Sequence, residues 1–309
     1  MTAVIRTDAL TKHYGRVHAL DGLDLVVEAG QVHGFLGPNG AGKSTTIRIL
    51  LGLARPTSGT ATVFGSDPWT DAARLHRRLA SVPGDVSLWP NISGGEAIDL
   101  VYRMRGGGTG PAYDTARRRL CDAFQLDTRT KGRAYSKGNR QKVALIAAFA
   151  VPAELYVLDE PTSGLDPLME VVFRQEVARV RDAGATVLLS SHILSEVELL
   201  CDRVSIVRAG RIVDTGSLAE MRHLTRTEVS FAASARATSA AAATVPGAEG
   251  VREDEGRISL TLASDAVAVA LPRLAELGVE GLRVAPPSLE ELFLRHYGAS
   301  DAPGEGTRR

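Results

Sequence analysis

The sequence predicts an α/β chain in two parts: a larger part built on a parallel sheet, and a small α+β part near the C-terminal end. Short apolar strand patterns alternate with helical patterns as far as residue 207, which is typical of parallel strands joined by helical crossovers. The composition then changes near Met221, ahead of an alanine-rich stretch at 233–243. A length of 309 residues also favours two domains over a single core.

The larger part is expected to begin with an edge of short strands. Strand patterns cover residues 3–10, 17–20 and 23–27, with Asp21-Gly22 as a hairpin-type turn. After them the chain alternates between predicted strands at 31–36, 60–64, 79–82, 155–158, 186–190 and 204–207 and predicted helices at 46–51, 71–80, 93–104, 113–124, 140–150, 168–181 and 194–201.

The smaller part combines predicted strands at 228–232, 257–262 and 282–284 with a predicted helix at 266–277. A further helix is predicted at 288–294, where Ser288 is the expected N-cap and Glu291 takes the capping-box position. We therefore expect a first domain at 1–220, a small accessory domain at 221–298 and a disordered tail at 299–309.

The overall composition is ordinary for a soluble globular protein, with 44% hydrophobic and 23% charged residues. A formal net charge of zero argues against a broad nucleic-acid-binding face, so no nucleic-acid partner is expected. The longest apolar run, 143–158, is interrupted by Pro152 and Glu154 and is too short to span a bilayer. No charged-then-apolar leader opens the sequence. We expect the chain to stay in the cytosol and to reach a membrane only through another subunit.

Two cysteines, Cys121 and Cys201, are far apart in apolar or helical contexts. A chain of this size does not need a disulfide for stability, so both thiols are predicted to be buried and reduced.

A glycine-rich turn between a predicted strand and a predicted helix matches G-x-x-x-x-G-K-[ST], the pattern of a phosphate-binding loop. Glycines let the backbone approach a phosphate, and the N–H groups of the turn and of the helix N-terminus bind the anion. Lys43 is expected to reach the β- and γ-phosphates, and the Ser44 hydroxyl to bind Mg²⁺. A chance match is the alternative, which the flanking strand and helix disfavour. The predicted nucleotide-binding residues here are Gly37, Pro38, Asn39, Gly40, Ala41, Gly42, Lys43, Ser44 and Thr45.

Two acids, Asp159 and Glu160, end the apolar strand predicted at 155–158. Ligands bind at such strand ends in open α/β sheets. Asp159 is expected to bind Mg²⁺, directly or through its water, and Glu160 to polarise the water that attacks a γ-phosphate. The alternative is a pair of solvated acids, which the upstream phosphate-binding loop disfavours.

Ser136 and Gly138 open the helix before that strand, and a Ser-x-Gly helix start is a second anion-binding candidate. One nucleotide already fills the first site, so two chains packed head to tail would let each Ser136 reach the other chain's γ-phosphate. The alternative is a plain helix with Ser136 as its N-cap.

With these motifs in order, the chain resembles the ATPase subunits of ABC transporters from residue 4 to about residue 218. The segment at 136–139 is similar to the family signature, and Asp159-Glu160 to the Walker B acids. Ser163-Gly164-Leu165-Asp166 resembles the D-loop, which implies that Asp166 belongs to the nucleotide site. His192 resembles the switch histidine at the γ-phosphate, and Tyr14 the aromatic that stacks on adenine. The resemblance implies a P-loop NTPase (ABC ATPase) core with a helical subdomain at about 83–140, a homodimer, and ATP with Mg²⁺ as cofactors.

A second segment, Ile92-Ser93-Gly94-Gly95-Glu96, matches the letters of the family signature better than 136–139 does. Its position decides against it, because the signature must begin the helix just before the Walker B strand. We interpret 92–96 as a loop with Ser93 near a helix start.

One motif departs from the family pattern. Where relatives usually carry a Gln or Glu that helps to hold Mg²⁺, this chain has Pro83-Gly84-Asp85. Gly84 has no side chain for that role, so Asp85 or a water is expected to take it.

The resemblance implies an ATP-hydrolysing subunit on the cytoplasmic side of the membrane, which drives export of a drug, antibiotic or other hydrophobic compound through a separate transmembrane permease. The C-terminal part resembles the extension of daunorubicin-type resistance ATPases, with an expected role in dimer contact or regulation. The alternative is an ABC-type ATPase that acts on ribosomes or DNA. A GTPase or small-molecule kinase is a third hypothesis, which leaves Ser136, Asp166 and His192 unexplained.

Overall fold

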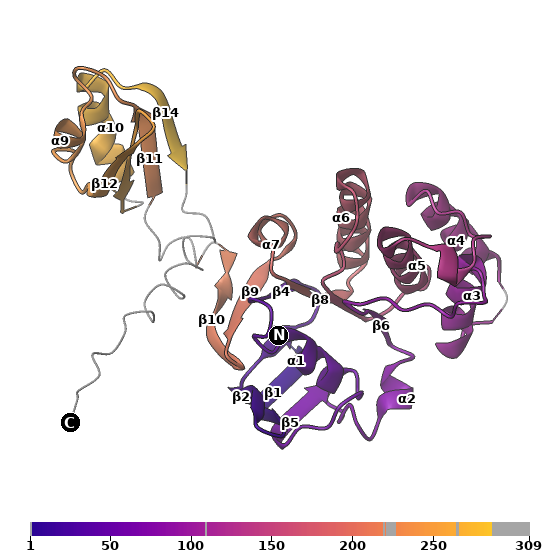
Figure 1. The fold of residues 1–309 in the computed structure, drawn as a ribbon. Helices are drawn as coiled ribbons and strands as arrows, with labels where there is room; N and C mark the ends of the chain where they lie inside the picture. The colour runs from indigo at the N-terminus through magenta and orange to yellow at the C-terminus, as the bar shows by residue number, and fades with distance from the viewer. Residues whose placement is uncertain (1, 109, 219, 221–226, 264–265, 286–309) are drawn as a thin grey trace. The chain divides into compact units, whose positions relative to one another are not determined.

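The computed structural model describes residues 2–108, 110–218, 220, 227–263 and 266–285 (Figure 1). The helix predicted at 288–294 and the tail predicted at 299–309 lie outside these residues. The chain divides into two compact units, Met1–Thr215 and Gly216–Arg309. The domain limits predicted from sequence are 1–220 and 221–298. We keep these limits as a proposal.

A six-stranded sheet forms the centre of the larger unit, in the order β10-β9-β4-β8-β7-β6. The pairs β9–β4, β4–β8, β8–β7 and β7–β6 are all parallel, as the alternation of strands and helices predicts. β10 was not predicted, because its residues alternate between exposed and half-buried. The strands are β4 (Val32–Leu36), β6 (Leu79–Val82), β7 (Leu155–Asp159), β8 (Thr186–Ser191), β9 (Arg203–Arg208) and β10 (Arg211–Ser217).

A second sheet, antiparallel, shares an apolar core with the central one. Its strands are β1 (Ala3–Tyr14), β2 (Val17–Leu23), β3 (Val26–Glu28) and β5 (Ser58–Val63). The hairpin turn predicted at Asp21-Gly22 is wrong: Tyr14 pairs with Val17, so β1 and β2 are joined by Gly15-Arg16. Gly22 has the left-handed φ of +71° that suggested a turn, but it lies inside β2 near an irregularity in the pairing.

Helices cover both faces of the central sheet (Figure 1). One face carries α6 (Pro167–Asp182) and α7 (Leu194–Leu200), and the other carries α1 (Lys43–Leu50) and the antiparallel sheet. Phe35, Ile47 and Leu188 belong to the continuous apolar core on that second side. α2 is a single turn, Ala72–Leu75, and not the predicted helix at 71–80, because the chain soon enters β6 to pair with β7.

The remaining helices of this unit gather beside the β6 edge of the sheet (Figure 1). They are α3 (Gly94–Met104), α4 (Pro111–Ala123) and α5 (Lys137–Phe149). A 3₁₀ turn at Gly132–Ala134 precedes α5. The predicted helices at 93–104, 113–124 and 140–150 agree with these to within a few residues.

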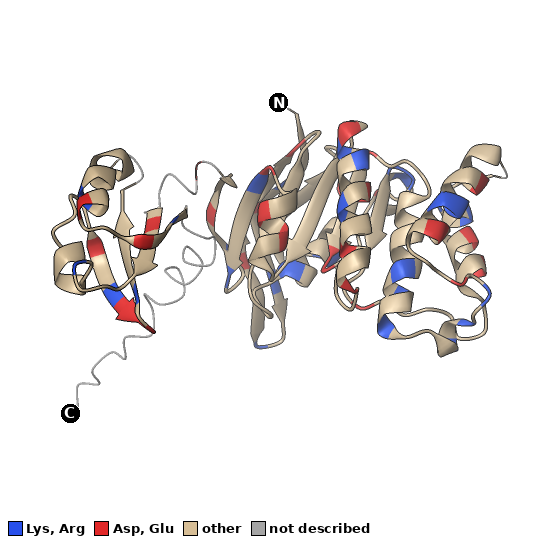
Figure 2. Ribbon diagram, turned by 90° about the horizontal axis from the view of Figure 1, so that it is seen from above, with Lys and Arg blue, Asp and Glu red and all other residues tan. Residues whose placement is uncertain are grey.

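Acidic and basic residues are interspersed along the helices of the larger unit (Figure 2). An ion pair between Arg119 of α4 and Glu176 of α6 joins the helices beside β6 to a helix that covers the central sheet. Burial alone would raise the pKa of Glu176, but hydrogen bonds from Arg119 and Arg179 outweigh it and hold that pKa below its usual range. The carboxylate is buried, so this double partnership stabilises the ionised form.

The smaller unit is an α+β structure, as predicted. Its antiparallel sheet has the order β12-β13-β11-β14, and Phe231, Ile258 and Leu274 belong to its own apolar core. All residues of the edge strand β14 are exposed. The other edge strand, β12, is also largely exposed and shows no alternation of buried and exposed residues, which is why it was not predicted. The elements are β11 (Thr227–Ala232), α9 (Ser239–Ala242), β12 (Glu249–Asp254), β13 (Arg257–Leu262), α10 (Val267–Glu276) and β14 (Glu280–Ala285).

Within the described part of the chain, no helix combines the length and apolar character needed to cross a membrane. Cys121 and Cys201 are both buried free thiols, as predicted.

His33 is a fully buried polar side chain, the second residue of β4. The Gln31 amide donates to its Nδ1 at 3.3 Å, which leaves the proton on Nε2 to be donated to Ser205 Oγ at 2.8 Å. Burial, helped by the charge of Arg203, lowers the pKa of His33 to about 4. The folded chain therefore holds this imidazole neutral where an unfolded chain would protonate it.

We expect this histidine to make folding acid-sensitive. Its folded pKa lies below the unfolded value of about 6.5, so the unfolded chain binds the extra proton between the two values. The stabilisation that comes from keeping His33 neutral is complete above about pH 6.5. As the pH falls toward 4, the free energy of unfolding decreases by about 2–3 kcal/mol. Denaturant unfolding of the native chain and of His33→Gln between pH 7 and 4.5 should show the variant losing less stability. Equal pH slopes for the two proteins would contradict the assignment.

Candidate functional site

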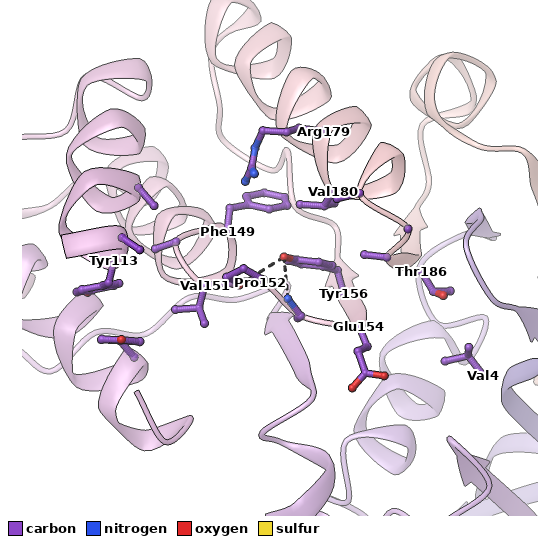
Figure 3. A pocket seen from close by; sticks show the side chains of 18 of the residues that line it. Val4, Tyr113, Phe149, Val151, Pro152, Glu154, Tyr156, Arg179, Val180 and Thr186 are labelled. Carbon is purple, nitrogen blue, oxygen red and sulfur yellow. Dashed lines mark hydrogen bonds between the residues drawn. The ribbon is translucent and has the colours of Figure 1, made fainter. Parts of the chain in front are cut away.

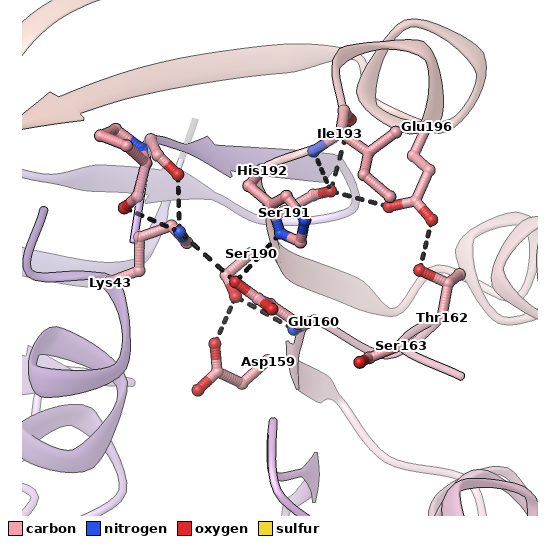
Figure 4. A network of polar contacts seen from close by, with 12 residues as sticks. Lys43, Asp159, Glu160, Thr162, Ser163, Ser190, Ser191, His192, Ile193 and Glu196 are labelled. Atoms are coloured by element: carbon pink, nitrogen blue, oxygen red, sulfur yellow. Dashed lines mark hydrogen bonds and ion pairs between the residues drawn. The ribbon is translucent and has the colours of Figure 1, made fainter. Parts of the chain in front are cut away.

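Four of the residues predicted from sequence, Lys43, Asp159, Glu160 and His192, lie close together where β4, β7 and β8 end. The parallel register places Leu36 opposite Ser191 and Asp159 opposite Ser190. The glycine-rich loop follows β4, the two acids end β7, and His192 follows β8. Figure 4 shows Lys43, Asp159, Glu160 and His192 pointing toward one another from these separate segments. The strand ends therefore form one polar site, the place where open α/β sheets bind ligands.

The loop from Gly37 to Gly42 turns sharply from β4 into α1. Gly42 is the N-cap of α1 with φ +112°, and a Cβ there would lie 2.8 Å from the carbonyl oxygen of Ala19. Only glycine fits this position, because the conformation is strained for L side chains and the backbone of β2 is already in contact. The turn leaves the first N–H groups of α1 without helical partners, which is the chemistry of an anion site.

Lys43 begins α1, and its side chain folds back over the loop. The ammonium donates to the carbonyl oxygens of Gly37 at 2.6 Å and Pro38 at 3.2 Å, and the side chain is almost completely buried. Ser44 is the next residue of the helix and is exposed. The loop thus holds the Lys43 ammonium in a fixed place, and the exposed Ser44 is its neighbour in the chain.

Glu160 lies between Lys43 and His192. Its Oε1 is 3.5 Å from Lys43 Nζ and 3.2 Å from His192 Nδ1. The backbone of Glu160 is left-handed, with φ +45°, and its N–H donates to the carbonyl and hydroxyl oxygens of Ser190. A non-glycine residue in this region is uncommon and costs energy, and it often marks a functional site. The strained turn aims the carboxylate across the strand ends.

Asp159 is buried at the end of β7 and accepts a hydrogen bond from the Ser190 hydroxyl. Its other oxygen faces Gly84, where a Cβ would lie 3.3 Å from Asp159 Oδ2. Asp85 is exposed, and no hydrogen bond or ion pair of the described residues joins it to Asp159 or Ser44. The structure therefore brings Asp159 to the site and does not bring Asp85 into contact with it.

An Mg²⁺ ion prefers one or two carboxylates, waters and substrate phosphate oxygens over a cage made entirely by protein. Asp159 and Ser44 supply such oxygen donors. No group of three or more His, Cys, Asp or Glu side chains placed to hold a metal occurs in the described ranges. The donor set fits an ion shared with a phosphate ligand.

The segment from Ser136 to Gly138 starts α5 and packs on the D-loop segment of the same chain. Ser136 Oγ accepts from Asn139 N at 3.2 Å, so Ser136 is the N-cap. Lys137 Nζ donates to Ser163 Oγ at 2.8 Å, and the Gln141 amide donates to the carbonyl oxygen of Pro161 at 2.8 Å. Ser136 is therefore an N-cap, as the alternative interpretation held. An N-cap can also leave the first N–H groups of the helix available to bind an anion.

Two further predicted residues have clear local settings. Asp166 is the N-cap of α6 and accepts from Met169 N at 3.0 Å. Tyr14 ends β1 with 47% of its surface exposed, and Lys12 Nζ lies 4.9 Å from its ring centre. An exposed ring is available for stacking.

Ser93 caps α3 in a full capping box, in which Glu96 N donates to Ser93 Oγ and Ser93 N donates to the Glu96 carboxylate. The expected helix start near Ser93 is confirmed, but the loop interpretation of 92–96 is wrong from Gly94 onward, since that residue already belongs to α3.

Four residues of the polar network were missed from sequence: Thr162, Ser190, Ser191 and Glu196. Ser190 donates to Asp159 at the end of β7 and accepts from the N–H of Glu160, the next residue. Glu196 of α7 accepts hydrogen bonds from Thr162 and Ser191 (Figure 4). Ser190 ends the strand predicted at 186–190 and Ser191 follows it, but neither was given a role. Thr162 and Glu196 carry no motif, because their contact depends on how the ends of β7 and β8 lie in space.

A separate cavity of about 530 Å³ opens where β7 and β8 begin, at the end of the sheet opposite the polar site. Tyr113, Phe149, Tyr156 and Val180 line it (Figure 3). It shares no lining residue with the polar site.

Comparisons with known proteins agree on one family. Residues 20–163 match the family described as ABC transporter. The chain is 40% identical over 223 residues to a daunorubicin/doxorubicin resistance ATP-binding protein of Streptomyces peucetius, covering 72% of this chain and 67% of that one. It is 36% identical to a daunorubicin resistance ATP-binding protein of Streptomyces coeruleorubidus, covering 95% and 96%. A bacitracin transport ATP-binding protein of Bacillus licheniformis is 35% identical, covering 69% and 70%.

Solved structures show the same fold. A structure of the ATP binding subunit of an ABC transporter matches with a TM-score of 0.67 and 30% identity, covering 72% of this chain and 92% of that chain. A dimeric ATP-binding cassette bound to ADP and Pi matches with a TM-score of 0.63 and 21% identity, covering 69% and 98%.

The packing of Gly138 leads to a stability prediction. A Cβ at Gly138 would lie 2.4 Å from the carbonyl oxygen of Gly164, so Gly138→Ala must displace the D-loop segment. We expect a loss of about 1 kcal/mol or more in the free energy of unfolding, despite the better helix preference of alanine. Gly108→Ala, with open space around the new Cβ, is the control and should change stability by less than about 0.5 kcal/mol. Equal stabilities of the two variants would show that the close approach is not constraining.

Proposed function

The chain belongs to the ATP-binding subunits of ABC transporters, an ATP-hydrolysing family, and on that premise we propose that it drives export of a drug, antibiotic or other hydrophobic compound through a separate membrane subunit. Two observations support this cargo class. A relative that matches over 95% of the chain is named for daunorubicin resistance. Two more relatives are named for daunorubicin/doxorubicin resistance and for bacitracin transport.

The arrangement of Lys43, Glu160 and His192 carries the proposed mechanism. In the proposal, the loop N–H groups from Gly37 to Thr45 and the Lys43 ammonium bind the β- and γ-phosphates of ATP. Glu160 accepts the proton of the attacking water, for which its carboxylate already projects from a strained turn at the strand end. His192, 3.2 Å from that carboxylate, contacts the γ-phosphate. Tyr14 stacks on adenine.

In the same proposal, Ser44 and Asp159 hold Mg²⁺ through their oxygen atoms. The ion would neutralise charge that develops on the phosphate oxygens. Ser190 orients Asp159 by donating to one of its oxygens, so that the other stays available. We keep Asp85 as the proposed outer ligand, acting through water, because it follows directly on Gly84, which faces Asp159.

We further propose that two copies of the chain complete each other's sites. Ser136 and Gly138 start α5 and would present its N-terminal N–H groups to the γ-phosphate held by the second copy. Asp166 lies on the D-loop, which packs against the same helix start, as the Lys137–Ser163 hydrogen bond shows. The homodimer would sit on the cytoplasmic side of the membrane, held there by a transmembrane permease.

Replacing the proposed base tests this mechanism. Glu160→Gln should lower the rate of ATP hydrolysis by about 100-fold or more, because the amide cannot accept the proton of the attacking water. ATP binding should persist, since the loop and Lys43 are unchanged, and the ATP-bound chain should accumulate as a dimer in size-exclusion chromatography. Phosphate release and nucleotide titration measure the first two effects.

Glu154→Gln is the matched control, because Glu154 precedes the same strand at its opposite end. It should keep the native hydrolysis rate. A Glu160→Gln chain that hydrolyses ATP at the native rate would refute the catalytic assignment.

A further inference from the structure

Glu196, in the first turn of α7, joins two loops of the site. One carboxylate oxygen accepts a hydrogen bond from Thr162 Oγ1, and the other accepts one from Ser191 Oγ at 2.7 Å (Figure 4). Both hydroxyl-bearing residues are buried and Glu196 itself is half-buried. A carboxylate suits this place because it offers one acceptor oxygen to each donor. The bridge therefore spans the ends of β7 and β8 from a third element.

Each hydroxyl is tied to a different functional loop. Ser191 directly precedes His192, and its Oγ also accepts from Ile193 N at 2.9 Å, so it fixes the backbone on both sides of the histidine. Thr162 lies between Glu160 and the D-loop, and its carbonyl oxygen accepts from Leu165 N at 2.9 Å. A movement of either loop must act on the same carboxylate.

The other polar links between these two loops lie nearer the strands. Ser190 binds Asp159 and Glu160, which are the last residue of β7 and the one after it. Among the hydrogen bonds of the described residues, Glu196 makes the connection that reaches beyond Glu160 toward Ser163 and Asp166. It is thus placed to set the D-loop and the switch histidine relative to one another.

We propose that Glu196 is a positioning residue for hydrolysis, which acts by holding Thr162 and Ser191 together so that His192 and the D-loop adopt their working positions as a unit. The inference rests on the proposed function, in which His192 contacts the γ-phosphate and the D-loop belongs to the dimer site. Glu196 itself lies beside the loops, and its hydrogen bonds in the described structure go to Thr162 and Ser191 rather than to Lys43 or Glu160.

Kinetics of the full chain test the role. Glu196→Ala should lower kcat for ATP by about tenfold and leave KM within about twofold, because the phosphate-binding loop is untouched. The double variant Thr162→Val with Ser191→Ala, which removes both donors, should show the same split. Adding Glu196→Ala to it should change kcat by less than about twofold, since the bridge is already gone. Ser195→Ala, an exposed neighbour on α7, should behave as the native chain.

Hydrogen exchange tests the bridge without relying on turnover. In Glu196→Ala, amide exchange should rise together in peptides covering 161–166 and 190–194, and stay unchanged in a peptide covering 37–45. If exchange rises in only one of the two loops or in neither, the bridge is refuted. A native kcat, or a fall in kcat matched by an equal rise in KM, would refute the positioning role. If the native chain does not hydrolyse ATP, the proposed function is refuted. The exchange experiment would then still test whether Glu196 holds the two loops together.

Discussion

The parallel register of β4, β7 and β8 is the constraint on which the site depends. Residues more than a hundred positions apart in sequence meet only because Leu36 lies opposite Ser191 and Asp159 opposite Ser190. The glycine-rich loop, the acids and the histidine each leave the sheet at the same edge. A shift of one residue in either pairing would turn every side chain of that strand to the other face and separate Lys43 from Glu160.

Within this edge, one carboxylate has two nitrogen partners. Glu160 lies 3.5 Å from the Lys43 ammonium and 3.2 Å from the His192 ring. In the proposed function these are the groups that bind the terminal phosphate, so ATP would compete with Glu160 for both of them. The carboxylate would then be released toward water, which is the position that a general base requires. Ser190 keeps the backbone of Glu160 in place throughout, through two bonds to one N–H.

Local patterns predicted most of the fold and the site. The glycine-rich loop, the acids after an apolar strand and the capped start of α5 are short-range signals, and the structure has each in the expected element. Asp21-Gly22 misled because a left-handed glycine suits a bulge as well as a turn. Glu196, Thr162 and Ser190 were missed for the opposite reason, since their meaning comes from long-range pairing. The role of Asp85 in holding Mg²⁺ remains a prediction, since no hydrogen bond or ion pair of the described residues joins it to the site. Its neighbour Gly84 faces Asp159.

The proposal that two copies complete each other's ATP sites is tested most directly by a cross-link between copies. Asn39→Cys and Ser136→Cys, combined in the Glu160→Gln chain, would place one thiol in the phosphate-binding loop and one at the start of α5. Cys121 and Cys201 are buried, so they should contribute little background. Mild oxidation with ATP and Mg²⁺ should produce a covalent dimer that neither single cysteine variant forms and that fails to appear without nucleotide. A chain that binds ATP yet stays monomeric under these conditions would contradict the shared site.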